Sequence, residues 1–234
     1  MARRLVVLDT ETTGLNARLG DRVIEIGCIE VLSRSVTERQ FHCYLNPERR
    51  IEEGAARVHG ITDEFLADKP KFAALAPSFL DFITGAELVI HNADFDVEFL
   101  DQELARAGLK KLAEYCAGIL DTLALARELH PGKKNSLDAL CERYAVSNAH
   151  RTLHGALLDA RLLAEVYLAM TRGQESLVME LDAPSAALLE AARIDSAMLL
   201  VIEATAQEIS AHEKLLDGID REAQGGSLWR RLWN

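Results

Sequence analysis

Two acidic residues near the N-terminus are spaced in a way that favours metal chemistry. The stretch LVVLDTETTG (5–14) runs from apolar residues directly into Asp9 and Glu11, with one residue between them. Because successive side chains of a strand point to opposite faces, these two carboxylates would share a face. Like charges held so close raise each other's pKa unless a cation lies between them. Either a metal ion neutralises the pair, or one acid caps the following turn while the other faces water.

Two later segments supply further residues of the same kind. HNADFD (91–96) follows a short apolar run and contributes Asp96, while LHGALLDA (153–160) contributes His154 and Asp159. Helical residues five apart differ by about 500° in direction, so His154 is predicted on the loop before the helix and Asp159 in its first turn. Ligands of open α/β sheets gather at the carboxyl ends of the strands. We therefore expect the three segments to converge there.

The elements that must position these residues follow from hydrophobic periodicity and breaker residues. We expect strands over residues 5–9, 23–32, 38–45, 87–91 and 118–121, with a turn at 33–37. We expect helices over residues 72–84, 95–107, 122–129, 136–144 and 156–170, and a turn-rich segment at 51–62. The linkers between the first three strands are too short for crossover helices, so these strands are predicted to be antiparallel. The pattern predicts an α/β domain with a mixed five-stranded sheet flanked by helices.

Composition limits the class of protein. The four cysteines form no C-x-x-C pair, which is typical of reduced thiols in the cytoplasm and not of a zinc site or disulfide frame. No apolar stretch approaches the roughly 20 residues of a membrane span, so a cytoplasmic protein without membrane contact is expected. The net charge of −11 at first disfavours a nucleic-acid partner. Residues 1–173 hold 26 acidic and 21 basic residues, however, and two divalent cations would offset most of that excess.

Three motifs in order, DTETTG, HNADFD and HGALLDA, resemble those of the DEDDh 3′–5′ exonucleases, which have a ribonuclease H-like fold. Within that family the chain is most similar to the proofreading subunits of bacterial replicative DNA polymerases. That closer resemblance is carried by VHGIT (58–62), NSLDALCERY (135–144), the segment 151–174, ISAHE (209–213) and GGSLWR (225–230). It covers essentially the whole chain, and it implies an enzyme that removes mispaired 3′-terminal nucleotides from DNA.

The resemblance assigns a role to each motif residue. It implies that Asp9, Glu11, Asp96 and Asp159 hold two divalent cations and that His154 is the general base. Oxygen ligands select hard ions, so Mg²⁺ or Mn²⁺ is expected. Two such ions stabilise both the attacking and the leaving oxygen of a displacement at phosphorus. Hydrolysis would release nucleoside monophosphates one at a time.

A pocket for a single-stranded or frayed 3′ end is expected beside the metals, because unpaired bases are held by stacking and backbone contacts. Its expected walls are Thr12, Thr13, Leu15, His59 and Phe95, and Asp9, Glu11 and Asp159 would also contact the substrate. An equal alternative for His59 is a hydrogen bond within its own turn. The family has an acidic residue five positions before the histidine of VHGIT, where this chain has Gly54 with Glu53 beside it. The role of that turn in holding the terminal nucleotide is left open.

The remainder of the chain predicts contacts with partners. We expect an exonuclease domain over residues 1–173, a linker over 174–184 and a polymerase-binding segment over 185–234, helical at 185–193 and 207–222. In the linker, Gln174, Leu177 and Met179 resemble the short peptide that docks in a sliding clamp. The competing interpretation is an ordinary linker with two apolar residues.

Two tryptophans lie within the last six residues of the sequence. Trp229 and Trp233 lie four residues apart on a predicted terminal helix, an arrangement typical of side chains that bury in a partner. The resemblance implies that this partner is the polymerase (α) subunit, and it also allows for a small accessory subunit. The alternative is that the tail packs back on its own domain.

Two other functions compete with proofreading. One is a free-standing 3′–5′ exonuclease that trims RNA or short oligonucleotides, which the long tail disfavours. The other is a non-catalytic structural subunit of the polymerase, which the presence of all five motif residues disfavours.

Overall fold

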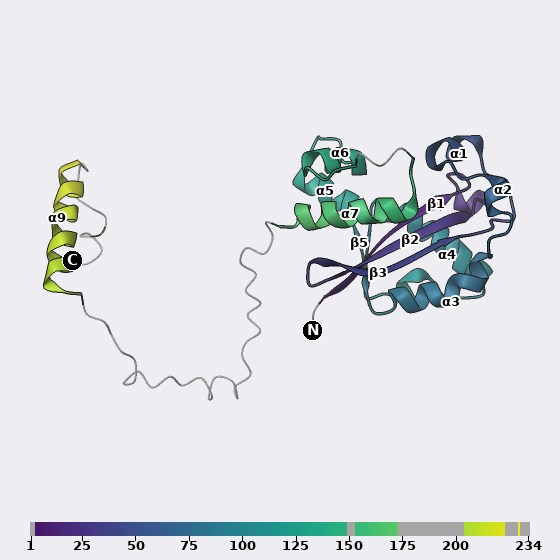
Figure 1. Cartoon of the computed structure of the whole chain (residues 1–234), viewed down its shortest axis with the longest axis horizontal. Helices are drawn as coiled ribbons and strands as arrows, with labels where there is room; N and C mark the ends of the chain where they lie inside the picture. The colour runs from purple at the N-terminus through teal and green to yellow at the C-terminus, as the bar shows by residue number, and fades with distance from the viewer. Residues whose placement is uncertain (1–2, 149–152, 173–203, 223–228, 230–234) are drawn as a thin grey trace, which may run out of the picture. The chain divides into compact units, whose positions relative to one another are not determined.

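The computed structural model describes residues 3–148, 153–172, 204–222 and 229, and the chain divides into two units, 1–177 and 178–234 (Figure 1). The first unit is built on a sheet with the strand order β3-β2-β1-β4-β5. The strands are β1 Arg4–Thr12, β2 Val23–Leu32, β3 Ser35–Tyr44, β4 Glu87–Ile90 and β5 Gly118–Asp121. β2 is antiparallel to both β1 and β3, whereas β4 is parallel to both β1 and β5. The predicted mixed five-stranded sheet is confirmed.

Three local predictions were wrong. The turn expected over residues 33–37 consists only of Ser33 and Arg34, because both have positive φ (50° and 61°) and close a tight two-residue hairpin. Serine and arginine rarely adopt positive φ, so the sequence gives no sign of this turn. The segment 51–62, expected to be turn-rich, contains the helix α1 Glu53–His59, which ends at Gly60 in the left-handed conformation. Strand β1 also extends beyond its predicted end, so that Glu11 lies within it.

The helices agree with the sequence pattern to within two residues at each end. They are α3 Phe72–Ile83, α4 Ala93–Arg106, α5 Thr122–Leu129, α6 Leu137–Arg143 and α7 Ala156–Met170. Shorter elements are α2 Asp63–Leu66 and the 3-10 turns η1 Ala17–Leu19 and η2 Leu112–Glu114. Side-chain caps fix several of the starts, and for α5 and α6 Asp121 accepts from the Leu123 amide and Ser136 from the Ala139 amide.

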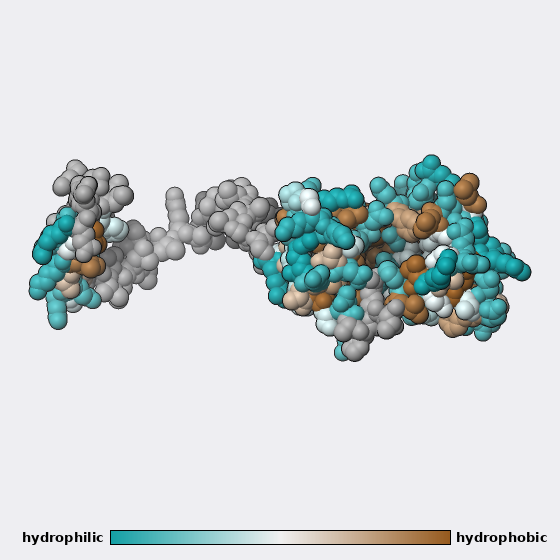
Figure 2. All heavy atoms as spheres, turned by 90° about the horizontal axis from the view of Figure 1, so that it is seen from above, coloured by the Kyte–Doolittle hydropathy of each residue, from teal (hydrophilic) through white to brown (hydrophobic). Residues whose placement is uncertain are grey.

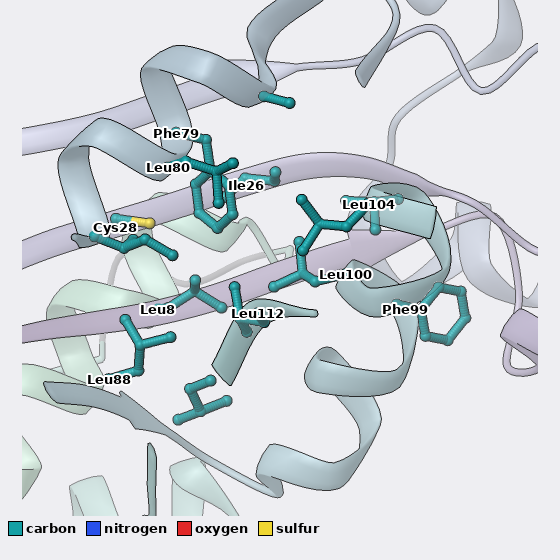
Figure 3. Close-up of a cluster of buried hydrophobic side chains, with 14 of the residues drawn as sticks. Leu8, Ile26, Cys28, Phe79, Leu80, Leu88, Phe99, Leu100, Leu104 and Leu112 are labelled. Carbon is teal, nitrogen blue, oxygen red and sulfur yellow. The ribbon is translucent and has the colours of Figure 1, made fainter. Parts of the chain in front are cut away.

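Helices cover both faces of the sheet, and hydrophilic side chains cover much of the outer face that Figure 2 shows. The alternation of β1 divides the interior into two cores. Val6 and Leu8 pack with side chains of α3 and α4, and Figure 3 shows part of this cluster around Leu8. Leu5 and Val7 pack on the opposite face with side chains of α5, α6 and α7. Since Asp9 and Glu11 continue the odd-numbered series, both point to the α7 side.

Gly27 lets α7 approach the sheet closely. A Cβ at this position would lie 2.3 Å from the backbone of Ala156 and Leu157, the first two residues of α7. Gly27 also stands opposite Asp9 in the β1–β2 register. The first turn of α7 therefore rests on the sheet directly beside the acidic part of β1, an approach that any larger residue would prevent.

The described part of the second unit is α9 Ala206–Glu222 with Trp229, close to the helix predicted over 207–222. Leu216 is buried, whereas Ile209, Leu215 and Ile219 are exposed, and the ring of Trp229 lies edge-on to His212. The predicted helix at 185–193, the peptide with Gln174, Leu177 and Met179, and Trp233 lie outside the described residues. Among the helices that the structure describes, none is long and apolar enough to cross a membrane.

Candidate active site

Two elements bring the motif residues of the first and third segments together. β1 presents Asp9 and Glu11, and α7 begins with Gly155 as its N-cap. His154 lies on the loop just before that cap, and Asp159 lies in the first turn of the helix. The placement predicted for these two residues is confirmed. The close approach at Gly27 brings this turn onto β1.

Glu11, His154 and Asp159 form a compact cluster of ligand atoms. One ligand atom of each lies within 4.8 Å of the others. The Nδ1 atom of His154 is 3.4 Å from a carboxylate oxygen of Asp159. The Asp159 side chain is only 4% exposed, whereas that of His154 is 45% exposed. The cluster thus has a buried acidic side and an imidazole that water can reach.

Asp96 lies in the first turn of α4, which packs on the other face of the sheet from α7. It is buried, and the Thr10 hydroxyl donates a hydrogen bond of 2.7 Å to its Oδ1 atom. Burial raises the pKa of Asp96 to about 7, with the charge of Asp121 adding to the rise and the bond from Thr10 opposing it. A buried carboxyl group of this kind favours either a proton or a neighbouring cation.

The cavity between these elements has a volume of about 630 Å³. Six of the sequence-predicted residues line it, namely Asp9, Glu11, Phe95, Asp96, His154 and Asp159. The structure thus brings together all four predicted carboxylates, the predicted base and one predicted wall. The Phe95 ring also packs against Phe99 in a tilted arrangement, with centroids 4.8 Å apart, which holds that wall on α4.

Four predicted wall residues lie outside the lining of this cavity. The Thr12 hydroxyl donates to the Gly14 carbonyl, and the fully buried Thr13 hydroxyl donates to Asp21. Both threonines thus hold the turn that follows β1. Leu15 is 83% exposed at that turn. Substrate contact by these residues stays a prediction.

His59, the fourth of these residues, is buried at the end of α1. Its Nδ1 atom accepts a hydrogen bond of 3.0 Å from the Ile61 amide, which is the turn bond given above as one alternative. Burial lowers its pKa, and the charge of His154 lowers it further. The His154 amide in turn donates to the Val58 carbonyl. His59 therefore lies close behind the cluster, and its contact with substrate stays a prediction.

Several residues that line the cavity were not predicted from the sequence to be part of the site. These are Thr10, His91, Asn92, Leu123, Arg127, Ser136, Leu137 and Asp138. Among the residues that line the cavity, Arg127 is the one lysine or arginine, and in the sequence it stands out only as part of the amphipathic helix α5. Asp138 was visible in NSLDALCERY, but its spacing alone did not connect it with the other acids.

The donor atoms suit a hard cation. Five carboxylates and two imidazoles line the cavity, and none of its lining residues is a cysteine. Such an oxygen-rich set favours Mg²⁺ or Mn²⁺ over metals that prefer sulfur ligands. A divalent cation would also relieve the repulsion between neighbouring carboxylates and favour the ionised form of Asp96.

Sequence comparisons identify the relatives of this chain. The exonuclease family matches residues 6–167. DNA polymerase III subunit epsilon of Escherichia coli K12 is 49% identical over 238 residues, covering 97% of both chains. The chain belongs to the DNA polymerase III epsilon family. The subunit epsilon of Haemophilus influenzae is 44% identical, covering 97% of this chain and 94% of that protein. As a member of the epsilon family, the chain is a nuclease that acts on DNA, with the divalent-metal dependence general to its exonuclease domain.

Solved structures agree with this assignment. Exonuclease X, in complex with 5′ overhanging duplex DNA, aligns with a TM-score of 0.57 and 28% identity, covering 74% of this chain and 94% of that one. Escherichia coli Exonuclease I in complex with a dT13 oligonucleotide aligns with a TM-score of 0.64 and 19% identity, covering 74% and 42%. The second similarity shows the fold alone, and both agree that the epsilon-family domain has a ribonuclease H-like fold.

Proposed function

We propose that this chain is the proofreading 3′–5′ exonuclease of a bacterial replicative DNA polymerase, and that it removes mispaired nucleotides from a single-stranded or frayed 3′ end. The observation that carries the proposal is the convergence of Asp9, Glu11, Asp96, Asp159 and His154 on one cavity. A non-catalytic structural subunit would have no use for four carboxylates placed around one hollow. Family membership gives the general activity, and the cavity supports the assignment of roles below.

The four carboxylates would hold two divalent cations, Mg²⁺ or Mn²⁺. When bound, these ions supply Lewis-acid stabilisation of the charge that develops on the attacking and leaving oxygens. The chain itself fixes the geometry, because β1 and the first turns of α4 and α7 are rigid elements packed on two separate cores. Thr10 orients Asp96 through its hydroxyl hydrogen bond.

His154 would act as the general base. Its Nδ1 atom lies 3.4 Å from a carboxylate oxygen of Asp159, and the side chain is 45% exposed, so water can reach the imidazole that would accept its proton. The water oxygen attacks the terminal phosphorus, and the bond from phosphorus to the 3′ oxygen of the preceding nucleotide breaks. That 3′ oxygen takes up a proton, and a nucleoside 5′-monophosphate leaves. The exposure of His154 gives the accepted proton a route to solvent.

The same proposal includes the organisation of the chain and its partners. Residues 1–173 would form the exonuclease domain, and residues 185–234, with Trp229 and Trp233, would bind the polymerase α subunit. The linker 174–184 would contact the sliding clamp through Gln174, Leu177 and Met179, and a small accessory subunit would join the same cytoplasmic assembly. The exposed apolar side chains of α9 support a partner for the tail.

The decisive experiment is hydrolysis of a labelled single-stranded DNA and of an RNA of the same sequence, each with Mg²⁺, with Mn²⁺ and with EDTA. We expect nucleoside monophosphates from DNA in either metal, little product from RNA, and none from either in EDTA. A preference for RNA would favour the trimming exonuclease instead. Cleavage of neither would favour the structural subunit.

A further inference from the structure

A second hollow in the first unit has the opposite charge from the active site. Arg22, Arg49, Arg50 and Arg106 converge on a hollow of about 520 Å³, which we call the arginine hollow. It draws these residues from the start of β2, the loop after β3 and the end of α4. Such a convergence is notable in a chain whose net charge is −11, because DNA approaching an acidic protein needs a local positive surface.

Two of these arginines have acidic partners. Arg22 donates to both carboxylate oxygens of Glu103 and to the Pro47 carbonyl. Arg49 lies 3.0 Å from a carboxylate oxygen of Asp21. These pairs hold the hollow in shape, because Arg22 and Glu103 are largely buried.

The other two arginines are available for a ligand. Arg50 and Arg106 are exposed, and within the part of the chain that the structure describes neither has an acidic partner. The one acid lining the hollow, Glu48, forms an ion pair with Lys71. A guanidinium group presents a planar fork of donors that matches phosphate oxygens. The hollow thus offers two free forks to an anion.

Hydrogen bonds connect the arginine hollow to the catalytic strand. The Thr13 hydroxyl donates to Asp21, the acid that also binds Arg49. The Glu52 amide, two residues beyond Arg50, donates to the Thr13 carbonyl at 2.8 Å. Thr13 follows Glu11 by two residues. The loop that carries Arg49 and Arg50 is therefore fixed relative to the active-site cavity.

The separation of the two sites suits a DNA strand. Asp96 lies in the first turn of α4 and Arg106 is its last residue, about 15 Å apart along the helix axis at 1.5 Å per residue. Along the axis of a B-form strand phosphates are about 3.4 Å apart, and an unpaired strand is more extended, so the distance corresponds to at most about four nucleotides. A dinucleotide bound in the cavity would not reach the hollow, whereas a longer strand would.

We propose that the arginine hollow binds backbone phosphates of the same DNA strand whose 3′ end enters the cavity, a few nucleotides upstream. The proposal rests on the proposed exonuclease function and adds the site that recognises strand length. Because such contacts are made equally before and during the reaction, they lower KM without changing kcat.

The test compares the double variant Arg50→Ala/Arg106→Ala with wild type on dT2 and on dT20. The matched control is Arg172→Ala, an exposed arginine just beyond the end of α7 that lies away from Asp159. We expect KM for dT20 to rise about five- to tenfold in the double variant, with kcat unchanged and with dT2 kinetics equal to those of wild type. The slope of log(kcat/KM) against log salt for dT20 should fall by about 1.4, since each lost phosphate contact removes about 0.7.

Four results would overturn the proposal. These are an unchanged KM for dT20, an equal rise in the Arg172→Ala control, a rise for dT2 as large as for dT20, and a rise seen only when dT20 is paired with a complementary strand. The last would assign the hollow to that other strand. Failure of the underlying function looks different, because wild-type protein would then hydrolyse neither substrate.

Discussion

The two hollows of the first unit use charge in opposite ways. In the active-site cavity, carboxylates from four elements line one hollow, and burial raises the pKa of Asp96 to about 7. In the arginine hollow, Arg22 and Arg49 are matched by Glu103 and Asp21. The cavity therefore concentrates charge that a ligand must neutralise, whereas the hollow pairs two of its four arginines with acids and leaves the other two for binding. The cavity is therefore suited to binding metal ions for catalysis, and the arginine hollow is suited to binding DNA phosphates.

The most severe test of this contrast is His154→Ala. It removes the proposed base from the cavity but leaves the four carboxylates and the arginine hollow intact. We expect kcat on dT20 to fall about 10²- to 10⁴-fold, with KM and Mn²⁺ affinity close to wild type. Steady-state kinetics and calorimetric titration with Mn²⁺ measure these quantities. His212→Ala, at an exposed histidine of α9, is the control, and unchanged turnover in His154→Ala would remove the residue from the mechanism.

Gly27→Ala is expected to reduce activity less than His154→Ala does. The new Cβ would meet the backbone of Ala156 and Leu157 at 2.3 Å, which forces the first turn of α7 away from β1. Displacing a reacting group by about 1 Å costs up to about 10²-fold, so kcat/KM should fall about 10- to 100-fold. Overpacking should also lower the free energy of unfolding by about 1–3 kcal/mol.

Gly118→Ala serves as the control for this variant, because its Cβ would meet only the Glu87 side chain, at 3.8 Å. The salt dependence of dT20 hydrolysis should stay at the wild-type slope in both variants, since the arginine hollow contains no part of α7. A Gly27→Ala enzyme with wild-type kcat/KM would show that α7 does not need this close approach.

The mildest effect concerns stability and pH. Burial raises the pKa of Asp96 from 3.8 to about 7, so the metal-free native state keeps a proton that the unfolded chain releases above about pH 4. The stabilisation from that proton is complete below about pH 4 and is lost as the pH rises through about 7. Asp96→Asn removes the titration and keeps an oxygen that accepts from Thr10.

We therefore expect the melting temperature of the metal-free Asp96→Asn variant to exceed that of wild type by at least about 2–4 °C at pH 8. This difference should shrink toward pH 4. Thermal unfolding in EDTA measures both values. His59 and His91, whose pKa values burial lowers, titrate in both proteins and cancel in the difference. A constant difference across this pH range would contradict a raised pKa at Asp96.

Much of the catalytic cavity could be predicted because its residues follow simple periodicities. The strand alternation placed Asp9 and Glu11 on one face, and the helical repeat placed His154 before α7 and Asp159 within it. Both rules act over a few residues. The antiparallel opening of the sheet followed from linker lengths for the same reason.

The arginine hollow could not be predicted in this way. Arg50 and Arg106 belong to segments more than fifty residues apart, and they meet because α4 ends near the start of β2, where Arg22 binds Glu103. No local sequence pattern predicts a contact between segments so far apart in the chain. The two-residue turn at Ser33 and Arg34 was missed for a different reason, because ordinary side chains there adopt a conformation usual for glycine or asparagine.

The close approach of α7 to β1 has a consequence for how the enzyme is made. Asp9 and Glu11 are among the first residues to leave the ribosome, but His154 and Asp159 follow only after all five strands have been synthesised. Contacts between such distant segments form late in folding, since a long loop must close first. A nascent chain that stops short of α7 would carry its carboxylates without being a nuclease. The capacity to cut DNA is acquired in one step, when the last helix of the first unit docks.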